Sequence, residues 1–144
     1  MLEVRFYDSV PEELLRFAVI ISKTDGKWVF CKHEERTTWE VPGGRREPGE
    51  DILETAKREL REETGAIDFT IRPVCAYSVK GRNSINKTDD DISYGMLFAA
   101  DIFSFGEIRS EIESISITEE LPDNWTYPEI QPKLMNEAER RGYL

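Results

Sequence analysis

The segment from Arg46 to Gly65 constrains the fold of this chain more than any other. It reads REPGEDILETAKRELREETG, in which helix-forming residues follow a loop that contains proline and glycine. We expect a helix from about Glu50 to Thr64, ended by Gly65, because glycine readily adopts the left-handed conformation that closes a helix. Such a helix has to bury one apolar stripe against the remainder of the chain.

Three glutamates border this stripe. At about 100° per residue, the core-facing arc is predicted to contain the apolar residues Ile52, Leu53, Ala56 and Leu60. The opposite, solvated arc contains the charged residues Glu54, Lys57, Arg58 and Arg61. Glu59 and Glu63 fall at the apolar edge and Glu62 flanks them, and the i, i+3 and i+4 spacing brings the carboxylates within reach of one another. Three like charges at a half-buried edge need a partner.

One interpretation of the glutamates is a metal site, since clustered carboxylate oxygens suit hard cations such as Mg²⁺ or Mn²⁺. The other is an ordinary charge-rich helix in water, and the spacing alone does not separate the two. The preceding loop, VPGGRREPGE, favours the metal site, because its glycines let the backbone approach a ligand and offer a carbonyl oxygen. Cations held beside such a loop are suited to binding a diphosphate.

These residues resemble the signature of the Nudix hydrolase family. The signature is G, five residues, E, seven residues, then R-E-U-x-E-E-x-G-U, where U is a bulky aliphatic residue. The matching residues of this chain are Gly44, Glu50, Arg58, Glu59, Leu60, Glu62, Glu63, Gly65 and Ala66. Ala66 is smaller than the usual residue at its position, which affects packing rather than chemistry.

The resemblance implies an α/β (α+β) fold, an α/β/α sandwich around a mixed β-sheet, with residues 1–144 as a single Nudix domain. The rest of the chain agrees, since apolar and alternating segments predict strands on either side of the helix. The predicted elements are strands at Leu14–Ser22, Trp28–His33, Ile67–Val79, Ile92–Phe103 and Gly106–Ile117, and a short helix within Tyr127–Leu144.

The resemblance also implies hydrolysis of a nucleoside diphosphate linked to another moiety, with Mg²⁺, or alternatively Mn²⁺, as cofactor. Glu59, Glu62 and Glu63 would be catalytic residues that bind the metal. The carbonyl of Gly43 would be a further ligand, and Arg58 would orient the glutamates through a salt bridge. The supporting positions would be Gly44, Glu50 and Gly65.

The general base that removes a proton from the attacking water varies within the family. Within the signature we favour Glu62. Outside it, Glu111 or Glu113 in the segment RSEIESIS are the alternatives, although glutamates at strand edges are commonly just solvated.

Composition limits the class of partner. The formal net charge is −10 and the pI is about 4.7, which argues against a nucleic-acid polymer as ligand. No apolar run approaches the roughly 18 residues that span a bilayer, and the charged N-terminal segment is unlike a signal peptide, so we expect a cytoplasmic protein. Cys31 and Cys75 are expected to be reduced, buried thiols, and His33, without cysteine partners, is given no metal role.

The substrate is the least constrained expectation. Trp39 either stacks on a base or packs its loop, and Arg45 and Arg46 either steer phosphates or are solvated surface cations. The compact size of the chain and the segment WEVPGG, which runs into the signature at Gly44, resemble the nucleoside-triphosphate pyrophosphohydrolases of the family. This branch includes enzymes that act on oxidised guanine nucleotides. ADP-ribose or a sugar nucleotide is the second expectation, and a non-catalytic, nucleotide-binding regulatory module is the alternative of another class. Both a monomer and a homodimer fit the sequence.

Overall fold

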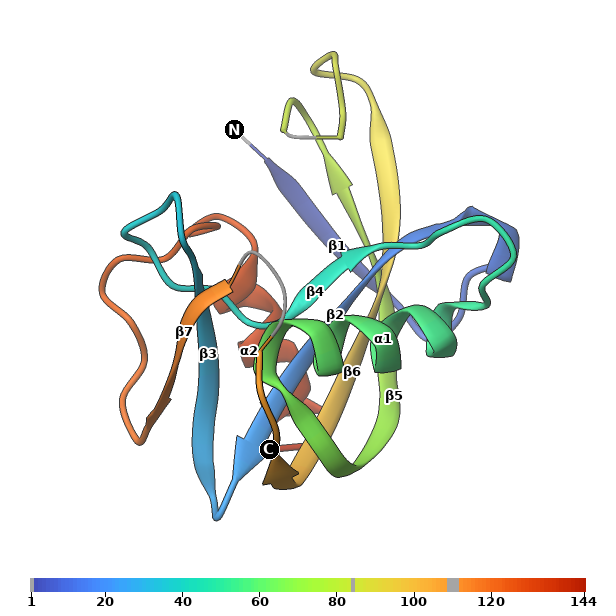
Figure 1. The fold of residues 1–144 in the computed structure, drawn as a ribbon. Helices are drawn as coiled ribbons and strands as arrows, with labels where there is room; N and C mark the ends of the chain where they lie inside the picture. Colours follow the sequence, from blue (N-terminus) through green and yellow to red (C-terminus); the bar gives the residue numbers. More distant parts are fainter. Residues whose placement is uncertain (1, 84, 109–111) are drawn as a thin grey trace.

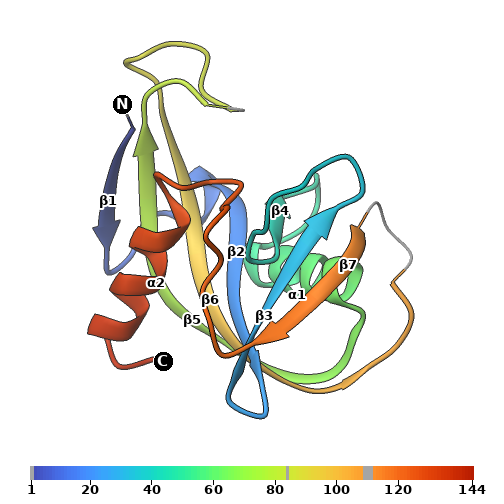
Figure 2. The same cartoon turned by 90° about the vertical axis from the view of Figure 1, so that its left-hand side faces the viewer.

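A computed structural model of the chain describes residues 2–83, 85–108 and 112–144. Within these residues, seven strands form one mixed sheet with a helix on each face (Figures 1 and 2). The strands are β1 (Glu3–Tyr7), β2 (Leu15–Thr24), β3 (Lys27–His33), β4 (Gly43–Arg45), β5 (Ala66–Lys80), β6 (Ile92–Phe105) and β7 (Ile112–Thr118). The helices are α1 (Ile52–Thr64) and α2 (Gln131–Arg140), and a single 3₁₀ turn, η1, spans Glu12–Leu14. The predicted α/β/α sandwich is confirmed.

The sheet has the order β1-β5-β6-β2-β3-β7, and β4 pairs with β2 outside this path. The pairing of β2 with β6 is parallel, and the other pairs are antiparallel. Strand β2 changes partner along its length: its Phe17–Val19 part pairs with β4, while its Ser22–Thr24 end pairs with β3. This change brings the segment Gly43–Arg45 against the middle of the sheet.

A separate apolar cluster lies on each face of the sheet. Beneath α1, the helix residues Ile52, Ala56 and Leu60 pack with sheet residues such as Ile20 and Phe98. On the opposite face, α2 covers a cluster with the residues Phe17, Ile21, Phe30, Val74, Tyr77, Leu97, Leu134, Met135 and Ala138. Within the described residues, neither helix has the length and apolar character that crossing a bilayer demands.

One predicted core residue of α1 is not buried. Leu53 is 39% exposed, so its assignment to the core-facing arc was wrong. The buried face of the helix is turned toward Thr55 and Glu63, which are 0% and 4% exposed. This rotation leaves Leu53 at the margin of the buried face, in the first turn of the helix.

Candidate active site

Local interactions fix both ends of helix α1. The side chain of Asp51 accepts a hydrogen bond from the backbone N–H of Glu54, and the side chain of Glu54 accepts one from the backbone N–H of Asp51. This reciprocal cap makes Ile52 the first helical residue, two positions later than predicted. At the other end, Gly65 adopts φ = 77° and its N–H donates to the carbonyl of Arg61, as its predicted role requires.

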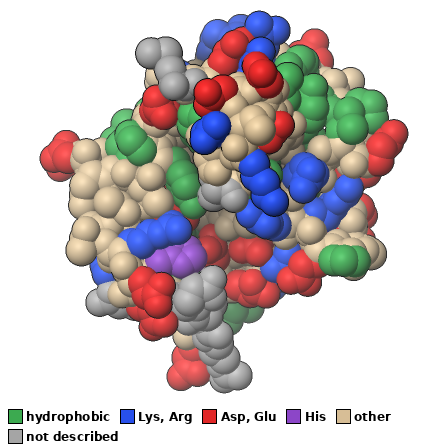
Figure 3. Space-filling model, turned by 90° about the horizontal axis from the view of Figure 1, so that it is seen from above, with side chains coloured by type: hydrophobic (Ala, Val, Ile, Leu, Met, Phe, Trp, Pro, Cys, Tyr) green, Lys and Arg blue, Asp and Glu red, His purple; other side chains and the backbone are tan. Residues whose placement is uncertain are grey.

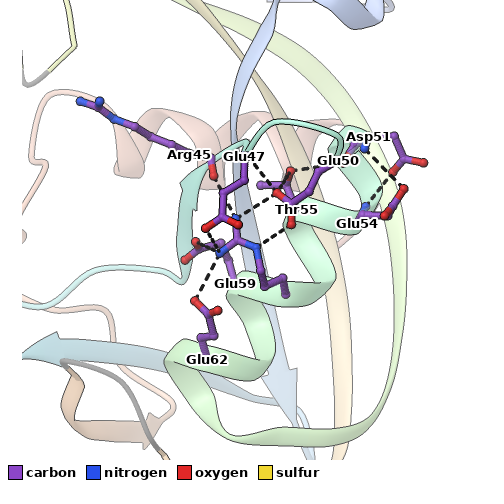
Figure 4. A network of polar contacts seen from close by, with 9 residues as sticks. Arg45, Glu47, Glu50, Asp51, Glu54, Thr55, Glu59 and Glu62 are labelled. Carbon is purple, nitrogen blue, oxygen red and sulfur yellow. Dashed lines mark hydrogen bonds and ion pairs between the residues drawn. The ribbon is translucent and has the colours of Figure 1, made fainter.

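The side chain of Arg58 joins the helix to the preceding loop through hydrogen bonds and ion pairs. Figure 4 shows this network, with its members Arg45, Glu50, Glu59 and Glu62 labelled. Its Nε and Nη2 donate to the two carboxylate oxygens of Glu50 at 2.6 and 3.0 Å. Its Nη1 lies 2.7 Å from Glu59 Oε1 and 3.3 Å from Glu62 Oε2. Its Nη2 also donates to the carbonyl of Arg45 at 3.0 Å. The wheel placed Arg58 on the solvated side, which was wrong for its side chain: the long stem bends over the helix surface, and the side chain is 22% exposed.

The network changes the acidity of its members. The guanidinium of Arg58 lowers the pKa of the Glu50 carboxyl to about 2, aided by the backbone N–H of Glu47 and the hydroxyl of Thr55. The same hydrogen bonds raise the pKa of Arg58. Both groups are therefore charged at neutral pH, and the bidentate pair holds the loop and the helix in one arrangement.

Glu63 is directed to a different set of partners from Glu59 and Glu62. It is 4% exposed, and its Oε1 accepts a hydrogen bond from the backbone N–H of Gly43 at 2.7 Å. Its Oε2 lies 3.2 Å from Nε2 of His33, at the end of β3. That nitrogen is also 3.6 Å from Oε2 of the buried Glu40. Local sequence patterns did not indicate these contacts, because they join segments that are distant along the chain.

Gly44 lies directly against Glu59. A Cβ atom at Gly44 would lie 2.5 Å from each carboxylate oxygen of Glu59, so the carboxylate fills the space that a side chain would take. At Gly43, a Cβ would lie 2.6 Å from the carbonyl oxygen of Ala18, which explains why β4 approaches β2 with glycine. The two glycines thus let the loop backbone lie between the sheet and the carboxylates.

The acidic side chains create a negative field beneath the loop. Burial raises the pKa of the Cys31 thiol, and the nearby charges of Glu63, Glu40 and Glu59 raise it further. Cys31 and Cys75 are both free and buried, as predicted. Seen from above, acidic side chains gather beside the single histidine, with Lys and Arg side chains on the adjoining rim (Figure 3).

The donor set has the chemistry of a site for hard divalent cations. Carboxylates of Glu59, Glu62 and Glu63 and the carbonyl of Gly43 offer oxygen atoms from one helix and one loop, as such ions require. Within the described ranges, no three His, Cys, Asp or Glu side chains converge closely enough to enclose an ion. In this arrangement Glu59 and Glu62 instead contact the cation of Arg58. The carboxylate and carbonyl oxygens of these residues are nevertheless the donor atoms that a hard divalent cation binds.

A pocket of about 180 Å³ adjoins the glutamates across the loop. Gly43, Gly44 and Arg45 line one side of it, and the first residues of α2 and the loop after β5 line the others. The remaining lining residues are Phe17, Ala18, Val19, Glu40, Val41, Tyr77, Val79, Asn83, Ile85, Tyr127, Ile130, Gln131 and Leu134. The loop Gly43–Arg45 therefore separates an apolar pocket from an acidic helix.

The structure distinguishes the two arginines of the loop. Arg45 lines the pocket, and its side chain points away from the glutamates (Figure 4). Arg46 is directed elsewhere: its Nη1 donates to the carbonyl of Glu12 at 2.9 Å and lies 3.3 Å from the Glu12 carboxylate. Arg46 thus fastens the loop to η1, and Arg45 is the better placed of the two for a substrate.

Trp39 lies beside Trp125 through backbone pairing, and its partly buried side chain packs against the apolar cluster under α2. It is absent from the pocket lining among the described residues, so the loop-packing alternative fits better than stacking on a base. Glu111 and the side chain of Glu113 lie outside the described part of the chain, and their proposed role as the base stays a prediction.

The known proteins related to this chain in sequence include a bacterial and a mammalian relative. "Putative 8-oxo-dGTP diphosphatase YtkD" of Bacillus subtilis (strain 168) is 34% identical over 83 residues, which cover 58% of this chain and 52% of that protein. "8-oxo-dGDP phosphatase NUDT18" of Mus musculus is 45% identical over 54 residues, which cover 38% of this chain and 16% of that protein. The matched segments thus span about half, or less, of these relatives' lengths.

Solved structures give the same architecture. The Bacillus subtilis pyrophosphohydrolase BsRppH has a TM-score of 0.78 and 24% identity, covering 99% of this chain and 92% of that chain. A UDP-X diphosphatase has a TM-score of 0.69 and 20% identity, covering 92% of this chain and 64% of that chain. At these identities the likeness shows the fold alone. The family model of the NUDIX domain matches residues 13–133, and the chain therefore belongs to the Nudix hydrolase family.

Proposed function

We propose that this chain is a Mg²⁺-dependent pyrophosphohydrolase that converts a nucleoside triphosphate into a nucleoside monophosphate and pyrophosphate. The observation that carries this proposal is the position of the loop Gly43–Arg45. On one side the loop lines the pocket, and on the other it contacts Glu59, Glu63 and Arg58. A nucleoside in the pocket would extend its phosphates across the glycines to the carboxylates of α1.

Glu59, Glu62, Glu63 and the carbonyl of Gly43 would hold the cation. When bound, a divalent cation offsets the charge of the phosphate oxygens and lowers the pKa of water. Mg²⁺ is the first choice because carboxylate, carbonyl and phosphate oxygens are its usual ligands, and Mn²⁺ is the alternative.

The chain's own residues then position the substrate and move one proton. Arg45, at the pocket wall, contacts the phosphates. Glu62 takes a proton from water, since its side chain is 50% exposed while Arg58 holds it beside the other carboxylates. The water oxygen bonds to a phosphorus atom of the α–β anhydride, and the bond from that phosphorus to the bridging oxygen breaks. The bridging oxygen keeps the electron pair and leaves with pyrophosphate when the α-phosphorus is attacked, or with the nucleoside monophosphate when the β-phosphorus is attacked.

Names of relatives suggest which nucleotides to test. Two related proteins are named for 8-oxo-dGTP and 8-oxo-dGDP, and structural neighbours are named as a pyrophosphohydrolase and a UDP-X diphosphatase. An oxidised guanine nucleotide is therefore the first candidate, with ADP-ribose or a sugar nucleotide second. A cytoplasmic location, a single domain and a monomeric or homodimeric state stay predictions.

A nucleotide panel with and without metal tests the proposal. We expect pyrophosphate release from a nucleoside triphosphate to require Mg²⁺ or Mn²⁺, with 8-oxo-dGTP, ADP-ribose and diadenosine polyphosphates in the same panel. Nucleotide binding without metal-dependent hydrolysis of any of them would favour the regulatory module instead.

The variant Glu62→Gln tests the assignment of the base. It should lower kcat by at least about a hundredfold, because a metal ligand or proton acceptor is lost while the fold is kept. Glu54→Gln is the matched control, since this exposed residue is on the same helix and glutamine still completes the cap. Equal turnover in both variants would remove Glu62 from the mechanism.

A further inference from the structure

Two carboxamide side chains border the pocket, and each is held in one orientation by backbone N–H groups. Gln131, the first residue of α2, is 5% exposed, and its Oε1 accepts a hydrogen bond from the backbone N–H of Val41 at 2.9 Å. Because a backbone N–H only donates, the atom facing it has to be the oxygen. The amide cannot flip without losing this bond, so its NH₂ group is directed to the other side.

Asn83 has the same arrangement in the loop after β5. Its Oδ1 accepts hydrogen bonds from the backbone N–H groups of Ile85 and Asn86 at 2.8 and 2.7 Å. The loop is itself anchored, since the buried Asn86 donates from Nδ2 to the carbonyls of Val79 and Asp91 at 2.9 and 3.0 Å. Asn83 is therefore also held with its oxygen occupied and its NH₂ group on the opposite side.

Neither NH₂ group has a partner within residues 2–83, 85–108 and 112–144. Over the same ranges, the fully enclosed side-chain atoms that lack a partner are the hydroxyls of Ser22 and Ser93. The Nε2 of Gln131 is not among them, so it retains contact with open space, and the pocket that Gln131 lines supplies that space. A hydrogen-bond donor that is nine-tenths buried and lacks a partner destabilises the folded protein, because its lost hydration is not replaced. A ligand that accepts its hydrogen bond removes this loss.

The other walls of the pocket suit an aromatic ring. Phe17, Tyr77, Val79 and Leu134 form apolar surfaces, while Gln131 and Asn83 come from separate elements, α2 and the loop after β5. A ligand with apolar faces and acceptor atoms at its edge satisfies both the walls and the two donors. A nucleobase has these properties.

We propose that this pocket selects nucleobases that carry a carbonyl group where adenine and cytosine carry an amino group, with Gln131 and Asn83 as the specificity-determining residues. The inference rests on the proposed function for its phosphate chemistry. Guanine and thymine or uracil present a carbonyl oxygen at this edge, whereas adenine and cytosine present an NH₂ donor. A base donor facing a fixed protein donor leaves two groups unpaired, which is expected to lower kcat/KM by about 10- to 100-fold.

Two pairs of nucleotides of matched size test the inference. In the wild type, kcat/KM for GTP should exceed that for ATP, and that for UTP should exceed that for CTP, each by at least about tenfold. The variant Gln131→Glu keeps an oxygen for the N–H of Val41 and replaces the NH₂ donor with an acceptor. Both ratios should fall by at least about tenfold in this variant. Asn83→Asp makes the same exchange on the other wall and should shift the ratios in the same direction.

Asn136→Asp is the matched control, because it adds the same charge to an exposed position of the same helix. Its ratios should equal those of the wild type. Thermal denaturation checks that each variant is folded. Wild-type ratios near one, or ratios that Gln131→Glu and Asn83→Asp leave unchanged in folded protein, would overturn the inference.

Equilibrium binding separates the failure of this inference from the failure of the proposed function. GMP and AMP, titrated by calorimetry without metal, test the pocket in the absence of hydrolysis. If no nucleotide is hydrolysed but GMP binds at least about tenfold more tightly than AMP, the proposed reaction fails and the pocket assignment stands. If nucleotides are hydrolysed and the two monophosphates bind equally, the reaction stands and the pocket assignment fails. Absence of both hydrolysis and binding overturns both.

Discussion

A methyl group added at Gly44 would displace the Glu59 carboxylate without removing it. The Cβ of Gly44→Ala would lie 2.5 Å from both oxygens of that carboxylate, whereas ordinary contacts begin near 3.4 Å. The nearest atoms belong to the end of a flexible side chain, so the backbone of β4 can stay in place. The carboxylate has to move by roughly 1 Å, which also strains its 2.7 Å contact with Arg58.

The displacement is expected to lower both the catalytic rate and the stability of the fold, by different amounts. For catalysis, a misplacement of about 1 Å in a reacting constellation lowers the rate by about a hundredfold, equivalent to about 2.7 kcal/mol of barrier. For stability, the loss is limited to part of one charge-assisted hydrogen bond on a side chain with other contacts, about 1 kcal/mol. In a chain of 144 residues this corresponds to a fall in Tm of about 3 °C.

The assay measures kcat for pyrophosphate release at saturating Mg²⁺, together with Tm, in Gly44→Ala and in Gly106→Ala. At Gly106 an added Cβ would lie 2.9 Å from the flexible end of Ile67, and it reaches none of the α1 glutamates. This control therefore also crowds a flexible side chain, to a smaller extent and away from the site. We expect the control to keep wild-type kcat. Full activity in a folded Gly44→Ala variant would refute the idea that the position of the Glu59 carboxylate determines the rate.

Three further outcomes are expected. The pKa of Glu50 is lowered from 4.5 to about 2 in the folded chain, so its contribution to stability is present above pH 4.5 and is lost as the pH falls toward 2. A Tm series should therefore decline less steeply over this range in Glu50→Gln, and parallel curves would contradict the shift. Arg58→Lys keeps the positive charge but loses the bidentate contact with Glu50, so kcat should fall by about 10- to 100-fold. An unchanged kcat would show that the bidentate contact is not needed for catalysis. His33→Ala removes a contact with Glu63, so half-activation should need about tenfold more Mg²⁺, and an unaltered titration would exclude this role.

Local sequence patterns predicted the central helix well because its determinants are local. The apolar spacing and the left-handed Gly65 lie within or beside the element that they define, and the Asp51 cap, which the predicted start at Glu50 missed, is equally local. The turn of the β2–β3 hairpin is equally local, since Asp25 and Gly26 both have the positive φ that a two-residue turn requires. Short-range chemistry of this kind needs no knowledge of the remaining fold.

Contacts between distant segments could not be predicted from the same patterns. Strand β1 is a five-residue edge strand, and it is held by pairing with β5 rather than by its own sequence. The hydrogen bond from Val41 to Gln131 joins residues 90 positions apart. For Arg58, the wheel located the Cα atom correctly but not the guanidinium, which reaches back eight positions to Glu50. Periodicity describes backbone faces, and long flexible side chains need not follow them.

The short strand β4 shows why these long-range contacts matter for the reaction. Each of its three residues makes a different contact: the N–H of Gly43 binds Glu63, Gly44 leaves room for Glu59, and the carbonyl of Arg45 binds Arg58. The same residues line the pocket. Strand β4 is held in place by pairing with β2 in the middle of the sheet. It therefore fixes the position of the pocket relative to the carboxylates of α1. The residues of the sequence signature provide the carboxylates, and the partner change of β2 sets their distance from the pocket.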